Sequence, residues 1–268
     1  MRVPWPFTKA WALVQGESLM IKISIITAVC NNCETISAAL DSALGQVGAN
    51  IELVVIDGGS TDGTLEVLRS YADRLAVLVS EPDRGIYDAL NKGIGRASGD
   101  VVGFLHSDDL FANPDVLSRI AAAFADPEVE AVYGDLLYVR KDNPDQVVRY
   151  WRSGVFSGRR LAWGWMPPHP TLYVRRDVYE QHGLFDTSFR IAADYDFILR
   201  LLGRGGVGVR YIPDVLVKMR VGGASNRSIR NIVRKSREDL RALRRNGVGG
   251  IGSLAWKNLS KLPQFLGR

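Results

Sequence analysis

The sequence predicts an α/β fold in which a mostly parallel sheet is flanked by helices. From residue 22 onward, short apolar runs rich in β-branched residues alternate with stretches that carry apolar side chains at helical spacing. Near-continuous apolar strands between amphipathic helices are typical of a parallel sheet that is covered on both faces. With 268 residues, the chain is long enough for one large domain of this class and a tail.

The alternation of strands and helices is regular up to about residue 128 and looser beyond it. The strands expected in the first part lie at residues 23–27, 51–56, 75–79 and 101–105, and the helices at 35–46, 61–68 with Thr61 as N-cap, 86–97 and 115–125. The later part is expected to hold strands at 131–135 and 147–151, a rigid aromatic loop at 163–170, and helices at 177–182, 193–203 and 226–245. No apolar run approaches the roughly 20 residues that a membrane-spanning helix needs.

Charge is distributed unevenly along the chain. Residues 1–200 hold 19 Lys and Arg against 26 Asp and Glu, whereas residues 201–268 hold 15 against 3. We therefore expect an N-terminal extension at 1–21, a main domain at 22–225 and a basic helical tail at 226–268. A tail of this kind indicates contact with an anionic surface, such as membrane lipid, nucleic acid or a phosphorylated acceptor.

The tail combines cationic and apolar side chains at helical spacing. The arginines are Arg230, Arg234, Arg237, Arg241, Arg244 and Arg245, and the apolar residues include Ile229, Ile232, Val233, Leu240, Leu243, Trp256, Leu259, Leu262 and Phe265. Such a pattern is typical of an interfacial segment that lies on an anionic bilayer. The alternative is that the apolar face docks on the main domain or on a second subunit. Nucleic acid is disfavoured, because the tail has no paired aromatic platform of the kind that single-strand binders use.

The only two cysteines, Cys30 and Cys33, are spaced C-x-x-C. This spacing is one that thioredoxin-like redox proteins use, so a redox function is one interpretation. Asn31 and Asn32 between them are not the usual redox surroundings, and no further cysteine is available to complete a zinc site. Two reduced thiols in a cytosolic protein is the interpretation that we favour.

Two adjacent acids, Asp108 and Asp109, follow the apolar strand at 101–105. Neighbouring carboxylates repel each other, but they are hard ligands that suit Mg²⁺ or Mn²⁺, which proteins usually hold with one or two carboxylates and substrate phosphates. The alternative is a solvated turn in which Asp109 or Asn113 caps the next helix. We predict that the pair binds a divalent metal ion.

Polar residues also follow the other expected strands. Thr27, Asp57 and the loop at 81–84 come at strand ends, where parallel sheets bind their ligands, so we expect them to converge with the acid pair on one edge. The glycines after Asp57 do not have the spacing of a dinucleotide motif. The Asp57 carboxylate could accept from a base N–H or a ribose hydroxyl, or it could simply order a turn.

The segment from Asp83 to Gly93 carries further candidate residues. Between Asp83 and Gly93, either Arg84 or Lys92 could neutralise a diphosphate, while Asp88 and Asn91 suit a solvated helix face equally well.

At the start of the helix at 193–203, Asp194 is either a general base or an acid favoured by the helix dipole. Asp196 follows on another side of that helix. His169, fixed between two prolines, is a candidate acceptor-side or phosphate contact and equally a structural histidine.

Five ordered motifs resemble glycosyltransferase family 2 of the GT-A fold. They are Ser24–Thr27 with Asn31, Val54–Thr64, Asp83–Gly93, Phe104–Asp109, and Phe185–Asp186 followed by Ala193–Asp196. The resemblance covers about residues 22–223. It implies a Rossmann-like catalytic domain at 22–225, with a nucleotide-sugar half at 22–110 and an acceptor half at 111–225.

The resemblance also implies a reaction and the residues that perform it. One sugar would pass with inversion from a nucleotide-sugar donor to a saccharide or lipid-linked acceptor. Thr27, Asn31, Asp57, Asp83, Arg84, Asn91 and Asp108 would bind the donor, Asp108 and Asp109 the Mg²⁺ or Mn²⁺ ion, and His169 and Asp196 would lie on the acceptor side. Asp194 would be the catalytic base.

Similar bacterial enzymes assemble exopolysaccharide, O-antigen or glycolipid. We expect a cytoplasmic enzyme, which the basic tail could hold at the inner face of the cytoplasmic membrane. The chain has no Gln-x-x-Arg-Trp run of the processive synthases, so addition of a single sugar is favoured. Cys30 stands where an aromatic residue is common, and Ala193 replaces an acid that often precedes the base. A nucleotidyltransferase and a non-catalytic nucleotide-sugar-binding protein are the competing interpretations.

Overall fold

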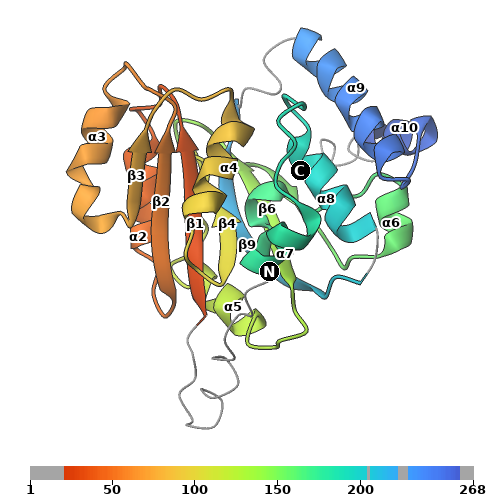
Figure 1. Cartoon of the computed structure of the whole chain (residues 1–268), viewed down its shortest axis with the longest axis horizontal. Helices are drawn as coiled ribbons and strands as arrows, with labels where there is room; N and C mark the ends of the chain where they lie inside the picture. Colours follow the sequence, from red (N-terminus) through yellow and green to blue (C-terminus); the bar gives the residue numbers. More distant parts are fainter. Residues whose placement is uncertain (1–20, 204–205, 223–228, 260–268) are drawn as a thin grey trace, which may run out of the picture.

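The computed structural model describes residues 21–203, 206–222 and 229–259. The predicted alternation of strands and helices is confirmed in the first part of this range. Its elements are β1 (Lys22–Val29), α2 (Ile36–Leu44), β2 (Asn50–Asp57), α3 (Thr64–Ser70), η1 (Ala72–Arg74), β3 (Val77–Ser80), α4 (Ile86–Arg96) and β4 (Val101–Phe104). The four strands pair in parallel in the order β3-β2-β1-β4 (Figure 1). The expected extension at 1–21 lies outside the described residues except for its last residue.

The sheet continues into a mixed second part. Its elements are β5 (Leu110–Phe111), α5 (Val116–Ala123), β6 (Ala131–Val139), β7 (Val147–Trp151), α6 (Gly158–Ala162), η2 (His169–Thr171), β8 (Tyr173–Arg175), α7 (Arg176–His182), α8 (Ala193–Gly203) and β9 (Val209–Arg220). The order runs on from β4 as β8-β6-β9-β5, with β7 paired to β6. β8 is antiparallel to both neighbours, whereas β6 and β9 are parallel.

The long strand β9 was not expected from the sequence. It contains Pro213, whose missing N–H argues against a place inside a sheet. The ladder with β6 jumps from the pair Tyr133–Tyr211 to the pair Asp135–Val215. Pro213 therefore lies in an irregular stretch of the strand, where no ladder hydrogen bond is needed from it.

Another local difference concerns the start of α3. Its N-cap is Gly63, at a φ of +95°, and not Thr61. The Thr61 N–H donates instead to the side chain of Asn31, 2.9 Å away. This hydrogen bond draws the residues ahead of α3 toward the end of β1.

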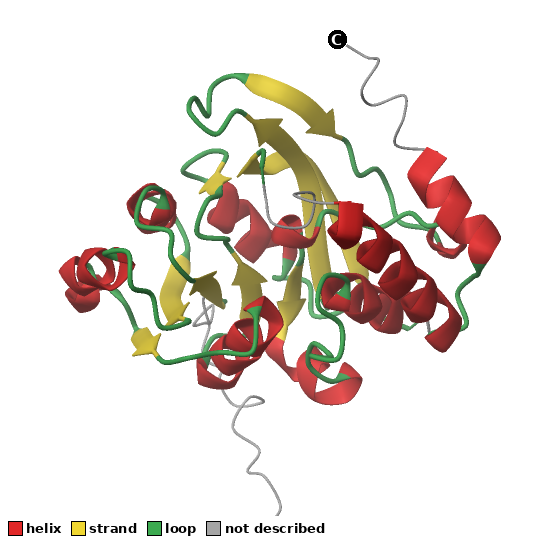
Figure 2. Ribbon diagram, turned by 90° about the horizontal axis from the view of Figure 1, so that it is seen from above, coloured by secondary structure: helices red, strands yellow, loops and turns green. Residues whose placement is uncertain are grey.

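Apolar side chains fill both faces of the sheet. Along β1, Ile26 belongs to one buried cluster while Ile23 and Ile25 belong to the other, as expected for side chains that alternate between faces. The first cluster packs against α4, α7 and α8, and the second against α2 and α5. Figure 2 shows helices on both sides of the sheet.

Two helices from the basic segment complete the described fold. α9 (Ile229–Arg245) and α10 (Ile251–Leu259) lie beside α8, at the end of the molecule opposite α3 (Figure 1). Ala242 and Leu243 are fully buried in the same cluster as α8. This part of α9 therefore docks on the rest of the fold, which was one of the two expectations for the tail. Leu262 and Phe265 lie outside the described residues.

Across the described ranges, no helix is both long enough and apolar enough to cross a membrane.

Candidate active site

The ends of β1, β2 and β3 lie in register at one edge of the sheet. Val29 pairs with Asp57, and Asp57 pairs with Ser80. The Asn32 side-chain amide donates to the hydroxyl of Ser107, 2.9 Å away, and so ties the end of β1 to the loop after β4. The predicted convergence of the polar segments is confirmed.

Asp57 is fully buried and orders the turn that follows β2. Its carboxylate accepts from the N–H of Ser60 at 3.1 Å and from the hydroxyl of Ser80 at 2.6 Å. The hydroxyl of Ser60 is a third donor, at 2.5 Å. Thr27, one strand away on β1, is also buried. The turn-ordering function that the sequence left open for Asp57 is present in the structure.

Asn31, Cys30 and Asp83 lie close to this turn. Asn31 adopts a left-handed conformation at a φ of 52°, and its N–H donates to the Ser60 hydroxyl at 2.8 Å. A Cβ atom at Gly58 would lie 2.4 Å from Asp83 Oδ2, so only glycine fits there without moving that carboxylate. Partial burial, and then the Asp83 carboxylate, raise the pKa of the Cys30 thiol. Cys30 and Cys33 are both free thiols, as expected.

The cations predicted to meet a diphosphate are paired with acids in this structure. The Arg84 side chain is 81% exposed and forms an ion pair with Asp88 at 3.1 Å. Lys92 pairs with Glu81 at 2.8 Å.

Asn91 holds the backbone of a distant loop. Its side-chain amide donates to the carbonyl of Phe185 at 2.8 Å and accepts from the Phe185 N–H at 3.0 Å. Asn91 therefore connects α4 to the loop that leads toward α8.

The two acids after β4 occupy different surroundings. Asp108 is half-buried, and its carbonyl accepts from Arg220 at 2.8 Å. Asp109 is completely buried, and neither of its carboxylate oxygens has a hydrogen-bond partner. Burial, and then the neighbouring Asp108, raise the pKa of Asp109 well above its usual range.

An orphaned buried carboxylate beside a more accessible one fits a divalent cation. No group of three or more His, Cys, Asp or Glu side chains that could hold a metal exists among the described residues. A cation at this place would have one or two carboxylate ligands from the described residues, as is usual for Mg²⁺ when substrate phosphates and waters supply the other ligands.

Asp194 lies in the first turn of α8 and is half-buried. The hydroxyl of Tyr87, on α4, lies 3.0 Å from Asp194 Oδ1 and 2.7 Å from the carbonyl oxygen of Ile191. Burial, and then the Asp194 carboxylate, raise the pKa of Tyr87 well above its usual value. Tyr87 therefore stays protonated, and its single O–H is shared between the Ile191 carbonyl and the Asp194 carboxylate. Tyr87 was not singled out from the sequence.

Two histidines lie near these acids, His106 half-buried and His169 buried. The rings of His106 and His169 lie 5.9 Å apart, and His169 stacks on Phe104 at 5.2 Å. Burial lowers the pKa of both, that of His169 to about 4, against the opposing effect of the Asp194 carboxylate. The Asp108 carboxylate also acts on His106. The charges of Asp108 and Asp194 thus both act on His106, and that of Asp194 also acts on His169.

His106 was not predicted as a site residue. Its position two residues before Asp108, directly after the same strand, was a signal in the sequence that could have indicated it. Asp196 lies apart from this group. Its carboxylate is fully buried and accepts from Arg200 at 2.9 Å and from Asn246 at 3.0 Å.

Comparison with known sequences gives the chain a family. Residues 24–190 match glycosyl transferase family 2. A PGL/p-HBAD biosynthesis glycosyltransferase of Mycobacterium bovis is 33% identical over 208 residues, which are 76% of this chain and 78% of the relative. The succinoglycan biosynthesis protein ExoO of Rhizobium meliloti is 30% identical over 69% of this chain and 56% of its own length.

Solved structures show the same fold. The mannosyltransferase PcManGT from Pyrobaculum calidifontis, solved with GDP-Man and Mn²⁺, has a TM-score of 0.65 at 21% identity and covers 93% of this chain and 74% of its own. TarS from S. aureus has a TM-score of 0.62 at 22% identity over 85% of this chain, which spans 39% of the TarS chain. The chain belongs to glycosyl transferase family 2 and is a glycosyltransferase with a GT-A fold.

Proposed function

We propose that this enzyme transfers one sugar, with inversion, from a nucleotide-sugar donor to a saccharide or lipid-linked acceptor. The proposal is carried by two observations: Asp109, after β4, is buried with both carboxylate oxygens unpartnered, and Asp194, on α8, lies with one oxygen 3.0 Å from the hydroxyl of Tyr87. A single displacement with inversion needs a base on one side of the sugar and stabilisation of the leaving group on the other.

The donor nucleotide binds at the ends of β1 and β2 in this proposal. Thr27, Asn31, Asp57 and Asp83 form the wall for the base and ribose, with Asp57 acting by holding the turn in place. Support comes from related folds, since PcManGT was solved with GDP-Man and TarS with UDP-GlcNAc. Asn91 would contribute indirectly by positioning Phe185, and Arg84 would have to leave Asp88 to reach the diphosphate.

Asp108 and Asp109 would hold a Mg²⁺ or Mn²⁺ ion. The bound cation would neutralise the negative charge that develops on the leaving nucleoside diphosphate. The orphaned oxygens of Asp109 support this assignment, and PcManGT was solved with Mn²⁺.

Asp194 would take the proton from the attacking acceptor hydroxyl, with Tyr87 holding its carboxylate in orientation. His106 and His169 remain neutral, so they neither compete for this proton nor repel a cation. Asp196, with its carboxylate turned into the fold, would support the acceptor side only through the position of α8.

The acceptor is proposed to be a cell-envelope saccharide or glycolipid precursor. The relatives are named for PGL/p-HBAD and succinoglycan biosynthesis. On α9, Ile232 and Val233 are exposed beside Arg230 and Arg237. Exposed apolar and cationic side chains on one helix suit the anionic inner face of the cytoplasmic membrane, where a lipid-linked acceptor would lie.

The donor can be identified by a thermal-shift screen against UDP-, GDP- and dTDP-sugars with Mn²⁺, because a specific ligand stabilises the folded state by mass action. Product analysis then separates the reaction classes. Sugar transfer releases a nucleoside diphosphate, nucleotidyl transfer releases pyrophosphate, and a pure binding protein releases neither.

The base is tested with Asp194→Asn. Donor affinity should be kept while turnover falls by at least ~10²–10⁴, the range typical of removing a general base. Loss of donor binding in parallel would contradict the base assignment and make Asp194 a structural cap of α8. Asp177→Asn, an exposed acid in the first turn of α7, is the matched control and should change neither quantity.

A further inference from the structure

A carboxylate from α9 holds the turn that leads into α8. Backbone nitrogens of Ile191 and Ala192 lie 2.8 and 3.0 Å from Oε2 of Glu238, and that of Arg190 lies 3.1 Å from the same oxygen. Three successive N–H groups that converge on one oxygen form an anion-binding nest. We propose that Glu238 is a positioning residue for the transfer reaction: it holds the Asp194 carboxylate in its working orientation by fixing this turn.

The need for an acceptor comes from the turn and from the start of the helix: the N–H groups of Arg190 and Ile191 precede α8, and that of Ala192 lies directly before its first residue. The first N–H groups of an α-helix have no partner within the helix, and acids near the N-terminus readily satisfy them. Asp194 is the second residue of α8, so its carboxylate is an acceptor within one helical turn of these N–H groups. With Glu238 occupying those donors, the Asp194 carboxylate remains directed at Tyr87.

Residue Ile191 is held from two sides. Its N–H donates to Glu238, on α9, and its carbonyl accepts from the hydroxyl of Tyr87, on α4. The same hydroxyl lies within hydrogen-bond distance of Asp194 Oδ1. A shift of the turn would therefore move the tyrosine contact and the carboxylate together.

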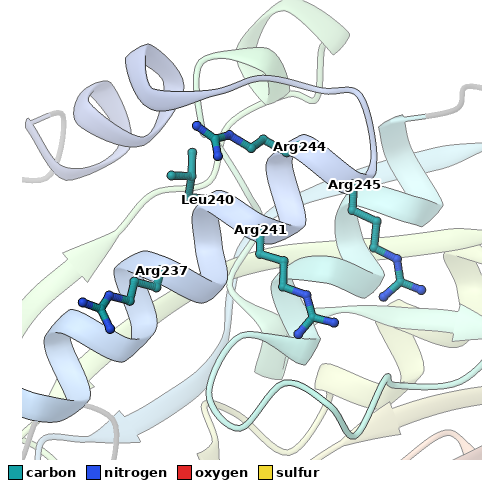
Figure 3. A pocket seen from close by; sticks show the side chains of 5 residues that line it. All are labelled: Arg237, Leu240, Arg241, Arg244 and Arg245. Atoms are coloured by element: carbon teal, nitrogen blue, oxygen red, sulfur yellow. The ribbon is translucent and has the colours of Figure 1, made fainter.

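Helix α9 is attached to the surrounding segment, 186–196, at further points. The guanidinium of Arg241 lies 4.5 Å from the ring centroid of Phe189, and Arg245 forms an ion pair with Asp186. Figure 3 shows Arg241 and Arg245 projecting from the same side of α9, while Arg237 and Arg244 project elsewhere. These contacts keep α9 in place, so removal of Glu238 alone should loosen the turn without detaching the helix.

The proposal rests on the proposed function, and its test has one arm that needs no substrate. Glu238→Ala, Glu238→Gln and the control Glu180→Ala, an exposed glutamate on α7, are compared by amide hydrogen exchange. Exchange at residues 190–192 should be at least about tenfold faster in Glu238→Ala, because three acceptor bonds are lost. Glu180→Ala should match the wild type. Glu238→Gln should retain part of the protection, since an amide oxygen still accepts.

The second arm measures cleavage of the nucleotide-sugar donor, in which the sugar passes either to the acceptor or to water. In Glu238→Ala, kcat should fall by about 10- to 100-fold, since a misplacement of about 1 Å can cost 10²-fold, while the Kd of the donor stays unchanged. Glu238→Gln should recover part of the loss. An unchanged kcat, unchanged exchange, or a parallel loss of donor binding and melting temperature would overturn the assignment. A wild-type protein that cleaves no nucleotide sugar would contradict the proposed function instead. Hydrogen exchange at residues 190–192 would still show whether Glu238 holds this turn.

Discussion

Asp108 and Asp109 are neighbours in the chain, yet one is half-buried and the other is sealed from solvent without a hydrogen-bond donor. We expect Mn²⁺ with a nucleoside diphosphate to raise the melting temperature of the wild type, and Asp108→Asn and Asp109→Asn should each lose this rise. An amide is a weaker ligand for a hard cation than a carboxylate.

Metal-free Asp109→Asn should be at least as stable as the wild type, because a neutral amide replaces a carboxylate that burial disfavours. Differential scanning calorimetry with and without the ion measures both effects. Asp142→Asn, in an exposed loop, is the control. If both variants of the acid pair keep the full metal-dependent rise, the metal assignment is wrong.

His169 should make the stability of the protein depend on pH. Burial lowers its pKa from the ordinary 6.5 to about 4, so between these values the unfolded chain binds the additional proton and stability rises with pH. The part of the free energy of unfolding that depends on neutral His169 is fully present above pH 6.5 and is lost as the pH falls toward 4. The change in the free energy of unfolding amounts to at most about 3.4 kcal/mol, for 2.5 pKa units at 1.36 kcal/mol per unit.

Replacing His169 with Gln should flatten this part of the stability curve, as measured by urea denaturation at pH 4.5, 5.5 and 7. His182, half-buried at the end of α7, provides the matched control His182→Gln. An equal slope in the His169 variant and the wild type would show that other groups govern the acid sensitivity.

At the scale of elements, α9 and α10 are joined by a buried ion pair. Lys257 Nζ lies 2.9 Å from Asp239 Oδ2, both side chains are almost fully buried, and the ammonium lies 3.2 Å from the ring centroid of Tyr195. Lys257→Met should cost about 3–5 kcal/mol, because it leaves a buried carboxylate without its counter-charge.

The double variant Lys257→Met with Asp239→Leu should recover most of this loss, since replacing both charges by apolar groups is often neutral. Lys141→Met breaks an exposed ion pair with Glu34 and should cost under about 1 kcal/mol. Urea denaturation compares the variants. A Lys257→Met loss as small as the Lys141→Met loss would contradict the expected burial of the pair.

The elements differ in how far the sequence could predict them. β1 to β4 and α4 follow from local periodicity, which belongs to the residues themselves. β9 could not be predicted, because Pro213 interrupts its pattern and its partner β6 lies far back in the chain. The three-residue strand β8 is too short to show a period.

The candidate site divides in the same way. Asp108 and Asp194 belong to motifs that the resemblance assigns. Their supports could not be predicted, because Tyr87 meets Asp194 across 107 residues and Glu238 meets Ile191 across 47. Only the fold brings such partners together.

At the scale of the whole molecule, the proposed membrane surface can be tested by charge reversal. Replacing Arg230, Arg234 and Arg237 with Glu should weaken binding to anionic vesicles by at least about a hundredfold, at roughly 1 kcal/mol for each cation lost near the surface. Flotation with phosphatidylserine vesicles, at low and high salt, measures this, and neutral phosphatidylcholine vesicles are the control. Equal flotation of the variant and the wild type would contradict the proposal. Deleting residues 227–268 would be a poorer test, because it also removes the buried Leu243 and Lys257.

The late position of β9 has a consequence for biosynthesis on the ribosome. The parallel unit β1–β4 is complete by Phe104. Within the described residues, one edge of β6 pairs with β9 alone, and Glu130 meets Gly208 across 78 residues. At about 5–20 residues per second, this edge of the nascent chain stays unpaired for roughly 4–16 s. An open strand edge invites pairing with other chains. We therefore expect the interval before β9 emerges to be a stage of synthesis at which this edge of β6 is open to pairing with other chains.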